Sequence, residues 1–524
     1  MAGVPKSRRC HRCKRNKIKC DEKWPICTAC KKADVVCSGP SNLTKFIYNG
    51  RHTSPPDKWD ANEHKERCHG TETPSGNLER IRHEDLPGGA SFSQFRVLAS
   101  EPRKTLTTVA DRVAARLVGY LTHENAGWDT LASIGYVKHL PIRLSESAAL
   151  RDSVALMCAT WANSRRNKVD TNQFLDDILY GKALRSLQRA LGDEKQQLRS
   201  ETLAATTILE RLEVIFDNRR PHFRTFHLFG IQELMLNRGP PDPRDDLDIQ
   251  LALENYASLA LRWLVEGGEN FYWSPLWKNA IEQAWPMLEK SVPSGRLERY
   301  KMNSYYGYWL VFVHKFRRIT RNSDSNSQRL QATALKAQIT KIQEELKAIG
   351  EPILQRDREQ GRIIELPHPE TPVGTRFHFG SLDSMSYVLS YGMISTIFNR
   401  ILYQLTGILG QHEAHLMAEY RALCRQMWMC IPFIKQLGIT PSILATLPMH
   451  ISYEGGNREE KEYLMDIITD VARFKGRYPA DRSAVERIVI KVAESMTGRR
   501  AVTAGINSPQ KKDGEGQGRY SEVV

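Results

Sequence analysis

The chain of 524 residues lacks the features of a membrane or secreted protein. No apolar run approaches the roughly 18 residues that a membrane-spanning helix needs. Residues 1–9 turn basic at once with no apolar segment behind them, so no secretory signal is expected. Aromatic residues make up only 8%, yet a composition 41% hydrophobic and 26% charged is ordinary for a globular protein. We therefore expect an intracellular protein with a buried core, and exclude a wholly disordered, collagenous or membrane-spanning chain.

Cysteine is scarce, with ten residues in all, but six of the ten fall within the first 40 residues. They form two units of the pattern Cys-x2-Cys-x6-Cys, and the second unit repeats the first at an offset of 17 residues. Inside the cell such thiols are metal ligands more often than disulfides, and zinc favours tetrahedral sulfur coordination. Six sulfurs are too few for two separate four-sulfur sites, but they suffice if two of them bridge a pair of zinc ions. The six are Cys10, Cys13, Cys20, Cys27, Cys30 and Cys37.

Positive charge is concentrated in the same block. Residues 1–40 hold 11 Lys and Arg against 3 Asp and Glu, a net charge of +8, so the rest of the chain contributes only +7 of the total +15. Such a block indicates a polyanionic partner, most often nucleic acid. On charge alone, a solvated tail or an import signal is an equal alternative. The lysines also favour the thiolate form of the cysteines over the thiol.

The cysteine pattern resembles the fungal zinc binuclear cluster family of transcription factors over residues 10–37. The resemblance implies two Zn²⁺ ions bridged by Cys10 and Cys27, and Pro25 matches the proline of the family's loop. Two other interpretations of the cysteines are a single zinc ribbon made by the two Cys-x2-Cys pairs and a thiolate-rich metal store. The implied ligand sets are Cys10, Cys13, Cys20 and Cys27 for one ion, and Cys10, Cys27, Cys30 and Cys37 for the other.

The same resemblance implies a DNA-reading helix over residues 13–20. Lys17 would read a CGG-type triplet in the major groove, where a lysine can donate to guanine O6 and N7. Asn16 stands where the family more often has Lys or Arg, and asparagine prefers adenine edges. The remaining basic residues would hold phosphates and set the position of the protein on DNA. These residues are Lys14, Arg15 and Lys19, with Arg8, Arg9 and Arg12 before them.

We predict a mainly α fold: a small two-zinc cluster module over 8–40, a flexible linker over 41–103, a large all-helical regulatory domain over 104–500 and a disordered tail over 501–524. Residues 367–373 are expected to form a loop, and the linker has no heptad run long enough for a coiled coil. A homodimer paired through the C-terminal region and a monomer both stay open. Apolar residues recur at helical spacing at 251–264, 335–349, 387–405, 416–433, 463–474 and 484–496.

More loosely, residues 105–480 resemble the regulatory region that often follows the zinc cluster in fungal factors. The matching fragments lie at 200–206, 227–240 and 273–277. In that family the region regulates activity and has no defined catalytic site.

Sequence motifs of enzymes are missing. His412 and His415 lack the spacing of a zinc-protease helix, and no phosphate loop or nucleophile elbow is found. We therefore expect no catalytic residues. The sequence predicts a nuclear, zinc-dependent transcription factor of RNA polymerase II genes, with double-stranded DNA and the transcription machinery as partners and no membrane. The alternative is a metal-responsive or protein-interaction module with a structural cluster.

Overall fold

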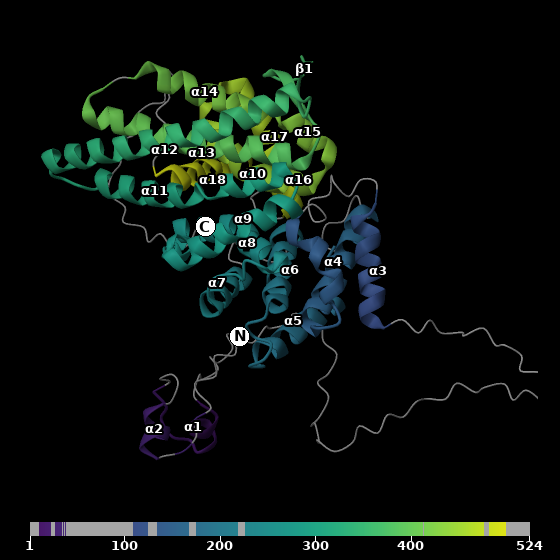
Figure 1. Cartoon of the computed structure of the whole chain (residues 1–524). Helices are drawn as coiled ribbons and strands as arrows, with labels where there is room; N and C mark the ends of the chain where they lie inside the picture. The colour runs from purple at the N-terminus through teal and green to yellow at the C-terminus, as the bar shows by residue number, and fades with distance from the viewer. Residues whose placement is uncertain are drawn as a thin grey trace, which may run out of the picture. The chain divides into compact units, whose positions relative to one another are not determined.

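The computed structural model divides into two compact units, Met1–Ala99 and Ser100–Val524 (Figure 1). The described residues are 10–21, 27–33, 35, 37, 108–123, 134–166, 174–217, 226–411, 413–475 and 481–498. The linker expected over 41–103 and the tail expected over 501–524 lie outside them. Across the described ranges, no helix combines the length and apolar character needed to span a membrane.

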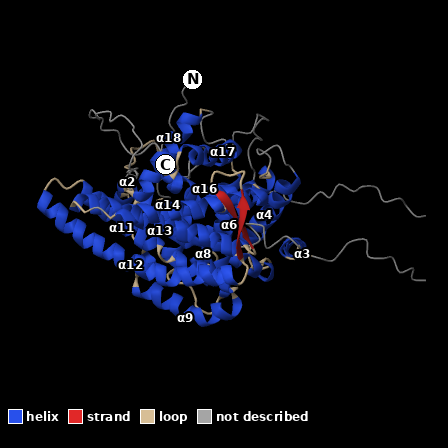
Figure 2. Cartoon of the chain, turned by 90° about the horizontal axis from the view of Figure 1, so that it is seen from above, coloured by secondary structure: helices blue, strands red, loops and turns tan. Residues whose placement is uncertain are grey.

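The second unit is mainly helical, which confirms the predicted fold class (Figure 2). Every segment predicted from helical spacing lies in a helix, although the segment 416–433 is interrupted at Cys430, where α14 ends and α15 begins. The helices are α3 Val109–Leu121, α4 Ala148–Arg166, α5 Asp177–Leu191, α6 Ser200–Phe216, α7 Phe226–Arg238, α8 Asp246–Glu266, α9 Pro275–Ser291, α10 Ser294–Asn303, α11 Tyr306–Thr320, α12 Ser325–Glu359, α13 Leu382–Leu409, α14 Ala414–Met429, α15 Ile431–Leu437, α16 Ile439–Ser452, α17 Arg458–Lys475 and α18 Arg482–Thr497.

Side-chain caps fix where several of these helices begin. Asp176 accepts hydrogen bonds from the backbone N–H groups of Ile178 and Leu179, both at 2.9 Å, at the start of α5. Asp324 and Asp481 cap α12 and α18 in the same way. Each cap satisfies N–H groups that have no partner within the helix, and its loss typically costs about 1 kcal/mol.

Helix α13 is the central element of the second unit. It is buried on nearly all sides and packs against α10, α11, α12, α14, α16 and α18. Most of its buried residues are apolar, and such residues are stable only where other elements cover them. Its approach to α12 is so close that a Cβ atom at Gly350 would lie 2.3 Å from the ring of Tyr391. Only glycine permits that distance between the two helices.

One apolar core runs through the unit from α3 to α18. Leu117 of α3 is fully buried in it, and the indole N–H of Trp309 in α11 donates to the carbonyl of Met496 in α18 at 2.5 Å. Residues 427–430 are all buried in this core. The first and last described helices of the unit therefore belong to the same folded body.

A β-hairpin corrects the description of the regulatory domain as all-helical. Strand β1, Ile363–His368, pairs antiparallel with β2, Gly374–Phe379, in the register Ile363 to Phe379 (red in Figure 2). The expected loop over 367–373 is therefore shorter, because Pro367 and His368 belong to β1. Proline has no N–H to donate, so it is tolerated in a strand where that position faces no neighbouring strand. In a two-stranded sheet, each strand has one edge without a neighbouring strand.

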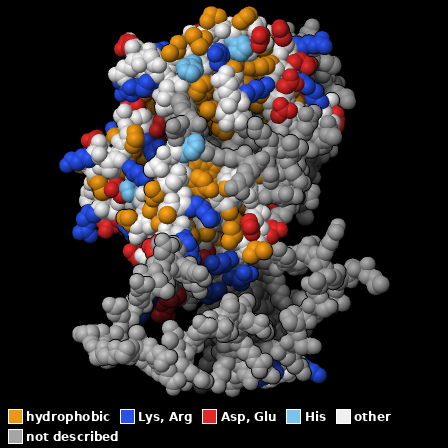
Figure 3. All heavy atoms as spheres, turned by 90° about the vertical axis from the view of Figure 1, so that its right-hand side faces the viewer, with side chains coloured by type: hydrophobic (Ala, Val, Ile, Leu, Met, Phe, Trp, Pro, Cys, Tyr) orange, Lys and Arg blue, Asp and Glu red, His pale blue; other side chains and the backbone are white. Residues whose placement is uncertain are grey.

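The surface of the second unit carries both signs of charge. On the face shown in Figure 3, Lys and Arg side chains appear together with Asp and Glu. Some of the unit's charges are paired, as where Arg482 contacts Glu462 at 3.0 Å and Asp466 at 3.1 Å. This mixture agrees with the small net charge of the chain beyond residue 40.

A chain that ends after Gln360 should not fold cooperatively, because it keeps α3–α12 but loses α13, which packs against α10, α11 and α12. Exposing that much core costs more than the roughly 5–15 kcal/mol by which a native protein is stable. Soluble yield and thermal unfolding by circular dichroism measure this, with a chain ending after Gly498 as the control. A cooperative transition in the shorter chain at the control's midpoint would contradict the prediction.

Candidate metal centre

The two cysteine units of the sequence fold into the same local structure. Each begins with a five-residue helix, α1 at His11–Arg15 and α2 at Thr28–Lys32. Each helix ends in the same turn: the N–H of Ile18 donates to the carbonyl of Cys13 at 3.0 Å, and the N–H of Val35 donates to that of Cys30 at 3.3 Å. A hydrogen bond over five residues is typical of a Schellman motif. The 17-residue repeat is thus a repeat of backbone structure.

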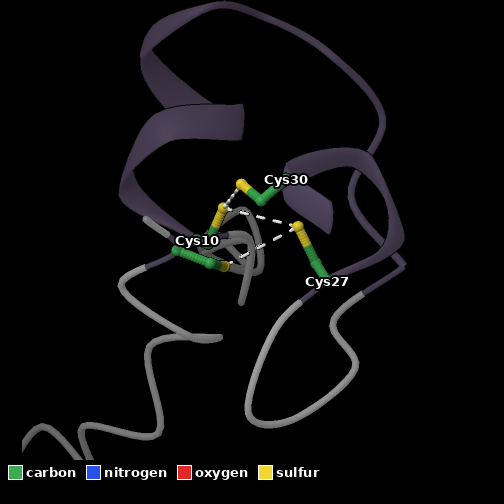
Figure 4. Close-up of side chains that lie close together, drawn as sticks. Cys10, Cys27 and Cys30 are labelled. Atoms are coloured by element: carbon green, nitrogen blue, oxygen red, sulfur yellow. Dashed lines mark hydrogen bonds between the residues drawn. The ribbon is translucent and has the colours of Figure 1, made fainter. Parts of the chain in front are cut away.

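The helices and turns bring the sulfur atoms of all six cysteines together. Cys10 Sγ lies 3.8 Å from Cys27 Sγ and 3.7 Å from Cys30 Sγ (Figure 4). Cys27 Sγ also lies 3.7 Å from Cys13 Sγ and 3.8 Å from Cys37 Sγ. Two groups could each hold a metal ion, with ligand atoms within 4.8 Å of one another. The groups are Cys10, Cys13, Cys20 and Cys27, and Cys10, Cys27, Cys30 and Cys37.

These distances fit tetrahedral zinc. A Zn–S bond of about 2.3 Å and a tetrahedral angle place neighbouring sulfurs about 3.8 Å apart. Cys10 and Cys27 occur in both groups, so the line between them is an edge that two tetrahedra can share. Six cysteines can therefore complete two four-sulfur sites only by sharing this pair.

The sulfurs also form the core of the N-terminal unit. Cys10, Cys13, Cys27 and Cys30 are fully buried, whereas the apolar side chains of Ile18 and Val35 are 38% and 40% exposed. No other buried side chain is found among the described residues of this unit. Five-residue helices are not stable by themselves. Bonds between a metal and the sulfurs are what could hold this unit together.

Burial opposes ionisation of these thiols. It raises the pKa of Cys13, and it also raises that of Cys30, although a hydrogen bond from Arg12 acts in the other direction. The pKa of both thiols is thus raised in spite of the lysine-rich surroundings. A bound cation would have to displace the protons, so metal affinity should fall as the pH falls.

Basic side chains predicted to contact DNA lie at the end of α1 and in the turn behind it. Arg15, Asn16, Lys17 and Lys19 are exposed, and within the described part of the chain no ion pair engages them. The helix expected over 13–20 ends at Arg15, because the turn closes there. Arg8, Arg9 and the side chain of Lys14 lie outside the described residues.

Lys17 has an unusual backbone conformation. Its φ of 54° is left-handed, a region that favours glycine, and the closing turn of α1 requires it at this position. For a residue with a side chain this costs roughly 1–2 kcal/mol. Backbone strain of this kind is often found at functional sites.

Two contacts of the cluster were not predicted from the sequence. Arg12, expected to hold a phosphate, is half-buried, and its Nη1 donates to Cys30 Sγ at 3.8 Å. Asp21 accepts a hydrogen bond from the N–H of Thr28 at 2.9 Å and a second from its hydroxyl. The sequence feature that could have indicated these contacts is the position of the residues next to the cysteines. Arg12 lies between two candidate ligands, and Asp21 and Thr28 each directly follow a candidate ligand.

Comparison with known protein families gives a match within the second unit. Residues 139–360 match the family model of the fungal specific transcription factor domain. No curated protein and no solved structure matches the chain. The match ends at the end of α12, although the apolar core continues to α18, and it does not include the cysteines. It supports a role in transcription regulation, and the matched family is not one of enzymes.

Substitution of the shared cysteines should affect both metal sites. We expect the full chain to bind two Zn²⁺, Cys20→Ala and Cys37→Ala to bind one each, and Cys27→Ala to bind neither tightly, because Cys27 belongs to both groups. Native mass spectrometry counts the ions. Cys68→Ala, which removes a cysteine outside the cluster, should still bind two. One tightly held ion in Cys27→Ala would show that this cysteine does not bridge.

Proposed function

We propose that this protein is a nuclear, sequence-specific DNA-binding transcription factor whose six N-terminal cysteines hold two zinc ions. The observation that carries the proposal is the arrangement of two four-sulfur groups that share Cys10 and Cys27, with exposed basic residues directly behind α1. The zinc ions supply structure rather than catalysis, since all four positions around each would be filled by sulfur.

The charge of the cluster favours a polyanion. Six thiolates and two Zn²⁺ sum to −2, which leaves residues 1–40 at about +6. The first repeat carries basic residues at four positions of its turn region, 14, 15, 17 and 19. The second repeat has Lys31 and Lys32 at the first two equivalent positions and Asp34 at the third. The first repeat is therefore the one that faces DNA.

Within the first repeat, Lys17 is the residue that reads bases. The left-handed backbone at the end of α1 places it where the chain turns, and its side chain is exposed. Lysine at this position can donate to guanine O6 and N7 of a CGG-type triplet. Arg15 and Lys19 hold phosphates on either side, which positions the cluster without selecting sequence.

The second unit regulates what the cluster does. Its match to the fungal specific transcription factor domain supports regulation of RNA polymerase II transcription in the nucleus. Double-stranded DNA and the transcription machinery are the partners that this function requires. Pairing of two chains would place two clusters on two half-sites.

Selection from randomised duplex DNA tests the proposed function. The zinc-loaded full chain should enrich CGG-type triplets, and the enrichment should disappear with chelator and in Cys27→Ala. A single triplet would indicate a monomer and a spaced pair a homodimer. No enrichment by a chain that holds two zinc ions would contradict DNA recognition and favour a structural cluster in a protein-interaction module.

Lys17→Gly separates base reading from folding. Glycine adopts the left-handed conformation without strain, so the turn and both zinc ions should remain while the ammonium group is lost. Discrimination between a CGG duplex and a scrambled duplex should fall about 5- to 150-fold, which corresponds to 1–3 kcal/mol. Competition gel shifts measure this.

The control is Lys19→Ala, which should weaken binding to both duplexes by the same factor. Unchanged discrimination in Lys17→Gly would remove this residue from the reading role.

A further inference from the structure

The structure sets Arg12 apart from the other basic residues of the N-terminal unit. Helix α1 holds it between Cys10 and Cys13, yet its guanidinium reaches the second repeat and donates to Cys30 Sγ at 3.8 Å. It is half-buried, whereas Arg15, on the same helix, is exposed. A side chain that points at the sulfurs is poorly placed to hold a phosphate.

The contact has no counterpart in the second repeat. The residue 17 positions after Arg12 is Ala29, which carries no donor. Arg12 is thus a basic side chain that donates to a cysteine sulfur of the cluster. Because it starts in one repeat and ends in the other, it also joins α1 to α2.

The sulfur that it contacts belongs to one metal group. Cys30 occurs only in the group with Cys10, Cys27 and Cys37. A thiolate that binds one ion keeps more negative charge than one that bridges two, so it gains more from a charged donor. Such partners of metal ligands typically change metal affinity 10- to 100-fold.

We infer that Arg12 is a positioning residue for the zinc ion held by Cys10, Cys27, Cys30 and Cys37, and that it does not contact DNA phosphate. The inference rests on the proposed function. Its guanidinium neutralises part of the thiolate charge, holds Cys30 in place and slows loss of that ion. The other ion, in the group that contains Cys20, does not depend on it.

Zinc release into a colorimetric chelator tests the inference on the full chain. Arg12→Met should release one of its two zinc ions about 10- to 100-fold faster than the wild type, and Arg12→Lys, which keeps the charge, should recover part of the difference. The matched control is Arg15→Met, which removes the same charge from the same helix and should release both ions at the wild-type rate. Equal rates in Arg12→Met and Arg15→Met would overturn the inference.

Two combined variants identify the ion. In a Cys20→Ala chain, which keeps the group with Cys30, Arg12→Met should speed release of the remaining ion. In a Cys37→Ala chain, which keeps the group with Cys20, Arg12→Met should leave the release rate of the remaining ion unchanged. The opposite pattern would overturn the assignment, and a wild-type chain that binds no zinc would overturn the proposed function together with it.

DNA binding provides a readout that separates the two roles. A lost phosphate contact lowers the salt slope of binding by about 0.9, so Arg15→Met should show this change. Arg12→Met, measured with excess zinc so that both ions stay bound, should keep the wild-type slope. A reduced slope in Arg12→Met with unchanged zinc release would return Arg12 to the phosphate role.

Discussion

The contacts among the cysteine sulfurs are the interaction on which the N-terminal unit depends. Four buried cysteines take the place of a hydrophobic core, while Ile18 and Val35 face solvent. Burial raises the pKa of the Cys13 thiol, and a bound cation could replace the protons of sulfurs that lie this close together. The short helices, the turns behind them and the exposed basic residues all keep their positions only while these sulfur contacts hold.

The two cysteine repeats share a backbone turn but carry different side chains. The turn that closes α1 recurs behind α2, but Lys17 is replaced by Asp34 and Arg12 by Ala29 at the equivalent positions. The first repeat therefore carries more basic residues after its second cysteine than the second repeat does. The arginine that donates to Cys30 Sγ also comes from the first repeat.

The second unit depends on a different constraint, the need to cover α13. Because this helix is buried on nearly all sides, the elements before and after it must pack together, and the core runs past residue 360, where the family match ends. The close approach at Gly350 allows α12 to cover one side of it. The matched residues and the helices after them therefore belong to a single folded body.

The sequence by itself determined that six cysteines gather, that the charge lies beside them and that the rest is helical, since spacing and periodicity are local patterns. It did not predict the end of α1 at Arg15, the strand containing Pro367 or the contact of Arg12 with Cys30. Each of these depends on neighbours supplied by folding: a turn bond across five residues, a partner strand, a sulfur 18 residues away. Tertiary structure decided them because local preference leaves several conformations of similar energy, and only contacts between segments select one.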